Sequence, residues 1–128
     1  MTTGLWKPDW KVLILLAVSS AAWAHHSFGM FDMQKTVTIT GTVKDFQWTN
    51  PHVWIDIVVP DTVANQTVTW SVEGGSTAIL MRMGWTRSAL KPGDKVTVVL
   101  NPLRTGAIGG SLVSASIEGT PIGHGYEP

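Results

Sequence analysis

The segment KTVTITGTVKDFQW, residues 35–48, constrains the fold more than any other part of the chain. Val37, Ile39 and Val43 alternate with threonines, and a period of two with β-branched side chains predicts a strand that is buried on one face. Gly41 lies on the same apolar face, where a glycine permits the sharp coiling that a small barrel needs. The pattern therefore predicts a strongly coiled strand.

The alternation changes phase near the end of this segment. Phe46 and Trp48 fall on the threonine face rather than on the valine face. Two explanations stay open: a β-bulge near Lys44 and Asp45, or a strand end that is covered on both sides.

Four further segments repeat the strand pattern, with turn signals between them. They are residues 52–59, 67–73, 94–100 and 111–118. Their expected inward residues are Val53, Ile55, Ile57 and Val59, then Val68, Trp70 and Val72, then Val96, Val98 and Leu100, and last Val113, Ala115 and Ile117.

One short helix is expected between the third and fourth strands. Ser76 is a suitable N-cap and Gly84 a suitable C-terminal cap, and Ile79, Leu80 and Met83 would form its apolar face. The order β-β-β-α-β-β predicts a mainly β fold, a small five-stranded barrel like the oligonucleotide/oligosaccharide-binding (OB) fold. An immunoglobulin-like sandwich would need about seven strands and no helix.

The chain begins with the pattern of a targeting signal. Lys7 and Lys11 form a basic segment just before an apolar run over residues 12–24. This run is shorter than the roughly 20 residues that span a bilayer. Ala22-Trp23-Ala24 matches a signal-peptidase site. Cleavage after Ala21 or Ala22, or an uncleaved anchor or buried first helix, are the alternatives.

These features predict the organisation of the chain. Residues 1–24 would be a cleavable secretory signal, 25–34 a mature N-terminal segment, 35–118 the barrel and 119–128 a flexible tail. The expected location is the bacterial periplasm, with no stable membrane span. Nine basic and nine acidic residues give no net charge, so the chain lacks the basic surface of a nucleic-acid binder. With no cysteine, the domain cannot use disulfides.

The histidines suggest a metal site. Cleavage before His25 would free an α-amino group, which can chelate a metal together with the imidazole of the same residue. His26 and His52 could add two more nitrogens, and such ligands suit copper, with Met30 and Met33 nearby as thioethers. This ligand set resembles the N-terminal histidine of copper oxygenases, although not their fold. The alternative is adventitious binding by two histidines at a flexible terminus.

Aromatic and acidic residues beside His52 suggest a ligand-binding face. Trp54 and Asp56 share the outward face of the second strand with His52, and Trp48 lies just before the intervening turn. An exposed tryptophan needs a ligand, a protein surface or its own chain as cover. The alternative is that Phe28 and Phe31 of the N-terminal segment fold back over Trp48 and Trp54.

No catalytic constellation can be assembled from the sequence, so an enzyme is the less favoured hypothesis. The serines lie outside any nucleophile-elbow pattern, and the glycine-rich loops lack a phosphate-binding motif. His52 and Asp56, two alternate positions apart, are too distant for a direct hydrogen bond.

Four motifs occur in a fixed order: AHHSFGMFD, TGTVKDFQWTNPHVWI, GWTRSALKPGDKV and NPLRTG followed by GG. Together they resemble a bacterial family called domain of unknown function 6152, over essentially the whole mature chain. The resemblance implies an exported bacterial domain and supports the barrel, without an assigned activity. The sequence thus predicts a periplasmic binding protein, with copper as the sharpest ligand hypothesis. The alternative is an accessory or interaction module for an exported enzyme or another periplasmic protein, without a metal.

Overall fold

The computed structural model describes residues 29–125. The predicted cleavage site, His25, His26 and Phe28 lie outside the described residues. The elements are β1 (Val37–Gln47), β2 (Trp54–Asp61), β3 (Gln66–Glu73), α2 (Thr77–Arg82), β4 (Lys95–Pro102), β5 (Gly110–Ile117) and β6 (Thr120–Pro121).

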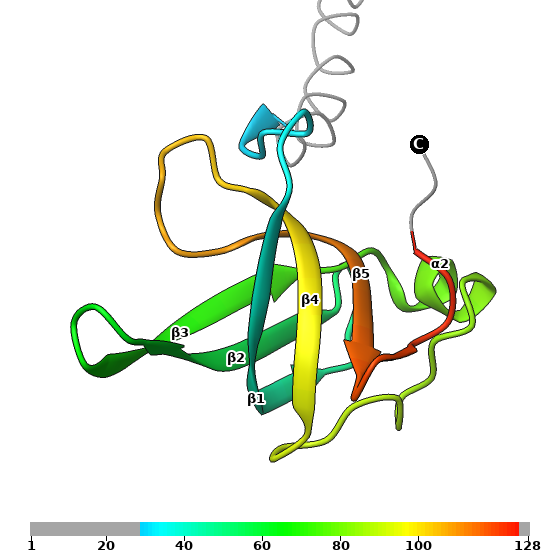
Figure 1. The fold of residues 1–128 in the computed structure, drawn as a ribbon. Coiled ribbons are helices and arrows are strands. Elements are labelled where there is room, and N and C mark those ends of the chain that lie inside the picture. Colours follow the sequence, from blue (N-terminus) through cyan, green and yellow to red (C-terminus); the bar gives the residue numbers. More distant parts are fainter. Residues whose placement is uncertain (1–28, 126–128) are drawn as a thin grey trace, which may run out of the picture.

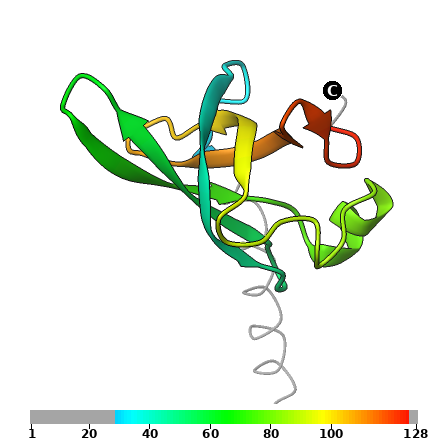
Figure 2. The ribbon, with the colours of Figure 1, turned by 60° about the horizontal axis from the view of Figure 1, so that its bottom comes forward.

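The first five strands form a closed barrel (Figures 1 and 2). The sheet order is β3-β2-β1-β4-β5-β6, with antiparallel neighbours. A short parallel pairing between β3 and β5, at Val72 with Gly110 and Glu73 with Ser111, closes the barrel. The prediction of a small five-stranded barrel with one helix between the third and fourth strands is confirmed.

β1 pairs with β4 in its first half and with β2 in its second half, and Thr42 pairs on both sides. A Cβ atom on Gly41 would lie 2.3 Å from the carbonyl oxygen of Val58, so only glycine fits where the strand changes partners. The register then skips Lys44, because Val43 pairs with Ile57 and Asp45 with Asp56. The bulge alternative is therefore the correct one, and it returns Phe46 to the core side.

The core fills the barrel and extends under the helix. Its fully buried members include Ile55, Ile57, Val96, Val98 and Leu100, all at positions expected to face inward. Leu80, Met83, Trp85 and Leu90 extend the same cluster from the segment between β3 and β4. The helix thus covers the barrel interior rather than forming a separate layer.

The helix has the predicted ends. The Ser76 side chain accepts a hydrogen bond from Ile79 N at 3.3 Å, and Gly84 adopts a positive φ of 87° just past the C-cap. Leu80 and Met83 are buried as expected, whereas Ile79 is 39% exposed. With only six residues, the helix turns too little of its surface toward the barrel to bury all three.

Two predictions about strand faces are corrected. Leu112, rather than Val113, is the buried residue at the start of β5, because a bulge leaves Val113 unpaired between Leu112 and Ser114 and shifts the phase by one. Trp70 is half-buried, because β3 meets β5 only at its last two residues, beyond Trp70.

The β2–β3 hairpin is longer than predicted. Residues 60 and 61 continue β2, with Pro60 paired to Thr67. β1 pairs with β2 only as far as Val58, so the missing N–H of Pro60 breaks no hydrogen bond to β1.

The chain after β5 is attached to the barrel as far as the structure describes it. β6 pairs with β5, and Ile122 N donates to Ala115 O at 2.9 Å. His124 N donates to Met83 O at 2.9 Å, which links this segment to the end of α2. The strand β6 was not expected from the turn-like composition of residues 119–128.

Candidate functional site

His52 lies in a β1–β2 loop that is held on both sides. The side-chain oxygen of Asn50 accepts hydrogen bonds from the N and Oγ1 of Thr77, at 3.1 and 3.0 Å, at the start of α2. Val53 N donates to Gly75 O at 3.0 Å, and Gly74 N donates to Val53 O at 2.7 Å. These contacts fix the backbone before His52 against the start of α2 and the backbone after it against the end of β3.

The imidazole of His52 is oriented by two acceptors. Its Nδ1 lies 3.0 Å from Glu73 Oε1 and 3.2 Å from the carbonyl oxygen of Gly74. Because both partners are acceptors, the tautomer that satisfies them has its proton on Nδ1 and its lone pair on Nε2. Within residues 29–125 no hydrogen bond engages Nε2, and the side chain is 35% exposed.

Trp54 and Asp56 extend this site along the outer face of β2. Trp54 pairs with Glu73 and Asp56 with Ser71 on β3, while the intervening Ile55 is fully buried, so Trp54 and Asp56 point outward. The Ser71 hydroxyl donates to the Asp56 carboxylate. We call this group, His52, Trp54, Asp56, Ser71 and Glu73, the outer β2–β3 face.

Trp48 does not belong to this face. Its ring centroid lies 5.8 Å from that of Phe46, and both rings pack against the barrel core. The expectation that Trp48 and Trp54 form one exposed aromatic surface is therefore wrong. The bulge at Lys44 is the cause, since it moves the end of β1 into the core phase.

The N-terminal segment packs beside the end of β4. Phe31 is 4% exposed and forms a bridge with Leu103, and Asp32 N donates to Pro102 O at 2.8 Å. The alternative in which Phe31 covers Trp48 and Trp54 is corrected by this placement. Arg104 N also donates to Met30 O at 2.9 Å, so the segment bonds to the backbone on both sides of Leu103. β2 is already paired with β1 and β3.

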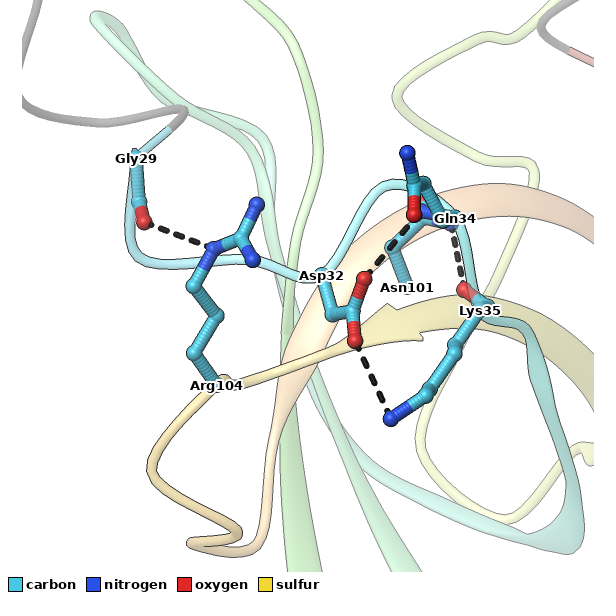
Figure 3. A network of polar contacts seen from close by, with 6 residues as sticks. All are labelled: Gly29, Asp32, Gln34, Lys35, Asn101 and Arg104. Atoms are coloured by element: carbon cyan, nitrogen blue, oxygen red, sulfur yellow. Dashed lines mark hydrogen bonds and ion pairs between the residues drawn. The ribbon is translucent and has the colours of Figure 1, made fainter.

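Polar contacts complete this attachment (Figure 3). Arg104 Nε donates to Gly29 O at 3.1 Å, and the buried Asn101 donates to Lys35 O at 2.7 Å. Lys35 Nζ lies 3.3 Å from Asp32 Oδ2. We call this group, residues 29–35 with Asn101, Leu103 and Arg104, the N-terminal collar.

The collar also affects the ionisation of its carboxylate. Desolvation opposes ionisation of Asp32, but hydrogen bonds from Lys35 and Gln34 N, with the charges of Lys35 and Arg104, hold its pKa below the ordinary value. A similar contact from Lys91 to Asp94, in the turn before β4, lowers the pKa of Asp94. Both carboxylates therefore remain charged under ordinary conditions.

The collar and the outer β2–β3 face are separated by two strand spacings. Asn101 pairs with Ser111 on β5, and Ser111 pairs with Glu73 on β3. The structure thus places His52, Trp54 and Asp56 on one face but leaves Trp48 out. Among residues 29–125, no three histidine or acidic side chains lie close enough to hold a metal ion.

The sequence patterns did not indicate Glu73 and Ser71 as members of the face, or Asn101 and Arg104 as members of the collar. The outward phase of the third strand contains both Ser71 and Glu73, and this was the available signal. No local pattern indicates that residues 29–35 meet the end of β4.

Comparisons with known proteins agree with this architecture. The sequence profile of a family of unknown function, DUF6152, matches residues 13–112. A crystal structure of the mitochondrial single-stranded DNA binding protein Rim1 from S. cerevisiae is similar, with a TM-score of 0.51 and 11% identity. The match covers 67% of this chain and 95% of Rim1.

A second crystal form of Rim1 gives a TM-score of 0.49 and 10% identity over 73% of this chain and 98% of the other. No curated protein matches the chain in sequence. At such identities the likeness concerns the fold, which is that of an OB barrel. Within the described range, no helix has the length and apolar character needed to cross a bilayer.

Proposed function

Because the chain belongs to the family of unknown function DUF6152, we propose a function from its own residues: a small periplasmic binding protein that binds copper. His52 is the ligand on the barrel, and His25 and His26 of the processed N-terminus supply the other nitrogens. Trp54 and Asp56 border the site on the outer β2–β3 face.

The arrangement of His52 is the observation that carries this proposal. A histidine that ligates a metal usually donates its other ring N–H to a carboxylate or a backbone carbonyl, which fixes the tautomer. His52 has both kinds of acceptor on Nδ1, Glu73 at 3.0 Å and Gly74 O at 3.2 Å, and Nε2 is left for a ligand.

The spacing along the chain supports participation of His25. Glu73 and Asn101 are two strand spacings apart, which is about 10 Å, and the collar binds Phe31 just beyond Asn101. The six residues from His25 to Phe31 can span about 20 Å when extended. A chain held at Phe31 is thus long enough to bring its first residue to His52.

Copper is the metal that this ligand set favours. Imidazole and amine nitrogens bind copper(II) most tightly among the common divalent metals, and thioethers suit copper(I). Met30 and Met33 lie in the collar and are 48% and 50% exposed, so their side chains are accessible to a copper ion.

The fold likeness to a DNA-binding protein does not extend to a proposal that this chain binds DNA. Asp45 pairs directly with Asp56 across β1 and β2, and Glu73 lies on the neighbouring strand. These carboxylates disfavour a phosphate backbone, whose recognition depends on lysine and arginine.

Titration calorimetry with copper(II) tests the proposal, on periplasmic protein whose intact mass shows a chain that begins at residue 25. We expect His25→Ala to lower the affinity most, because it removes a ring nitrogen and alters the chelate of the amino group. His52→Ala should lower it by about tenfold or more. His124→Ala is the matched control and should change little.

The affinity should also fall as the pH drops below about 6.5, the usual histidine pKa, because the ligands must be unprotonated. Equal affinities of the unaltered protein and the His25→Ala variant would overturn the copper proposal. The accessory-module hypothesis would then replace it.

A further inference from the structure

One edge of β3 has no strand beside it over most of its length. β2 pairs with β3 on one side from Gln66 to Glu73, whereas β5 reaches the other side only at Val72 and Glu73. Across the part of the chain that the structure describes, no backbone hydrogen bond from a loop fills the second side between Gln66 and Trp70.

This edge carries none of the features that usually prevent a strand from pairing with another chain. Proteins protect such edges with charged residues, proline, bulges or very short strands. The segment QTVTW, residues 66–70, contains neither a charge nor a proline, and its register with β2 is regular. The unprotected edge is thus suited to accept a further strand.

The two ends of the edge each present an exposed apolar side chain. Val63, in the turn between β2 and β3, is 97% exposed. At the other end, the β4–β5 loop approaches β3 so closely that a Cβ atom on Gly109 would lie 2.9 Å from Ser71 O, and the adjacent Ile108 is 50% exposed. Both views show the β2–β3 hairpin projecting from the barrel on the side of this loop (Figures 1 and 2).

We propose that a second copy of this chain pairs with this edge, β3 against β3 in antiparallel orientation about a two-fold axis at Val68. Gln66 of each copy then lies opposite Trp70 of the other, and Thr67 opposite Thr69. Thr–Thr pairs across antiparallel strands are favourable, and the edge has no charge that would repel its own copy.

The antiparallel orientation also accounts for the two exposed apolar residues. It brings the hairpin turn of each copy, with Val63, to the β4–β5 loop of the other, with Ile108. The two-fold symmetry forms this contact twice, as expected for a self-complementary interface. Five residues of strand with two small apolar contacts make a small interface, so the dimer is weak and depends on concentration.

Sedimentation equilibrium at rising protein concentration tests the proposal on the protein as a bacterial host produces it. We expect a reversible monomer–dimer equilibrium. A variant with Thr67→Lys and Thr69→Lys places lysine opposite lysine at both sites, and should raise the dimer dissociation constant about tenfold or more. Both threonines are exposed, so the barrel should still fold, which thermal unfolding verifies.

The matched variant carries Thr67→Lys and Thr69→Glu, which places each lysine opposite a glutamate of the other copy. It should dimerise at least as tightly as the unaltered protein. A protein that is monomeric at every concentration, a double-lysine variant that dimerises normally, or a Lys/Glu variant that is also monomeric would each overturn the proposal.

Discussion

The N-terminal collar and the outer β2–β3 face are both polar groups on the outside of one barrel, but their hydrogen bonds differ in kind. In the collar, the side chains of Asn101 and Arg104 bind backbone carbonyls of the segment they hold. On the face, Glu73 and Gly74 O bind one nitrogen of His52, and the other nitrogen is not engaged in the described structure.

This difference indicates that the collar attaches the N-terminal segment to the barrel, whereas the outer β2–β3 face keeps a nitrogen available for a ligand. Side chains that bind backbone carbonyls stabilise the path of the chain, because those carbonyls would otherwise be left unsatisfied. A side chain that is already oriented by one hydrogen bond, with its other polar atom free, can bind a ligand with little loss of conformational entropy. We therefore expect substitutions in the collar to alter stability, and substitutions on the face to alter binding.

The largest expected effect is on the collar. Phe31→Ala removes a buried aromatic ring and should lower the free energy of unfolding by about 3 kcal/mol, measured by urea denaturation. Met30→Ala is the control, since Met30 is adjacent and half-exposed, and it should change stability by less than about 0.5 kcal/mol. Equal losses for the two variants would show that the collar is not anchored by Phe31.

The next effect separates the polar part of the collar from its aromatic anchor. Asn101→Ala leaves Lys35 O without its donor and should cost about 1–3 kcal/mol of stability. Copper affinity should stay unchanged. Gln34→Ala is the control, because only the backbone N of Gln34 bonds within the collar. If Asn101→Ala bound copper more weakly but unfolded normally, the collar would contribute to copper binding and not to the attachment of the N-terminal segment.

On the outer β2–β3 face, Glu73→Gln should lower copper affinity about 10–100-fold, because the amide orients His52 less well than the carboxylate. Stability should change by less than about 1 kcal/mol, since the surface pair is partly exposed. Asp56→Asn removes an equal charge from the same face without touching His52. Equal losses of affinity in both variants would indicate a general charge effect instead.

The smallest effect is a pH dependence in the collar. The pKa of Asp32 lies below its ordinary value of 3.8 in the folded state, so its charged form stabilises the protein fully above that pH. The contribution is lost as the pH falls through the lowered pKa. The difference in stability between the unaltered protein and Asp32→Asn should therefore shrink in acid, as followed by thermal unfolding from pH 7 to pH 2. A difference that is constant with pH would exclude this role of Asp32.

Local patterns in the sequence determined the strands, the helix and its ends, because alternation and capping depend on residues a few positions apart. Val53, Ile55 and Ile57 are buried as their spacing predicts, and Ser76 and Gly84 bound the helix as expected. The order of these elements was enough to predict the barrel. The cleavage site and the roles of His25 and His26 stay predictions.

Only the tertiary structure decided which residues meet between distant segments. The bulge at Lys44, one of the two alternatives that the sequence leaves open, packs Trp48 against the core, and the bulge at Val113 brings Leu112 inward. Glu73 reaches His52 because the β2–β3 pairing sets Glu73 opposite Trp54 and continues from Val53 to Gly74 and Gly75. Phe31 meets Leu103 because Pro102 O and Arg104 N, at the end of β4, bond to the backbone of Asp32 and Met30. His52 and Glu73 are 21 positions apart and Phe31 and Leu103 are 72 apart, so no local period encodes these contacts.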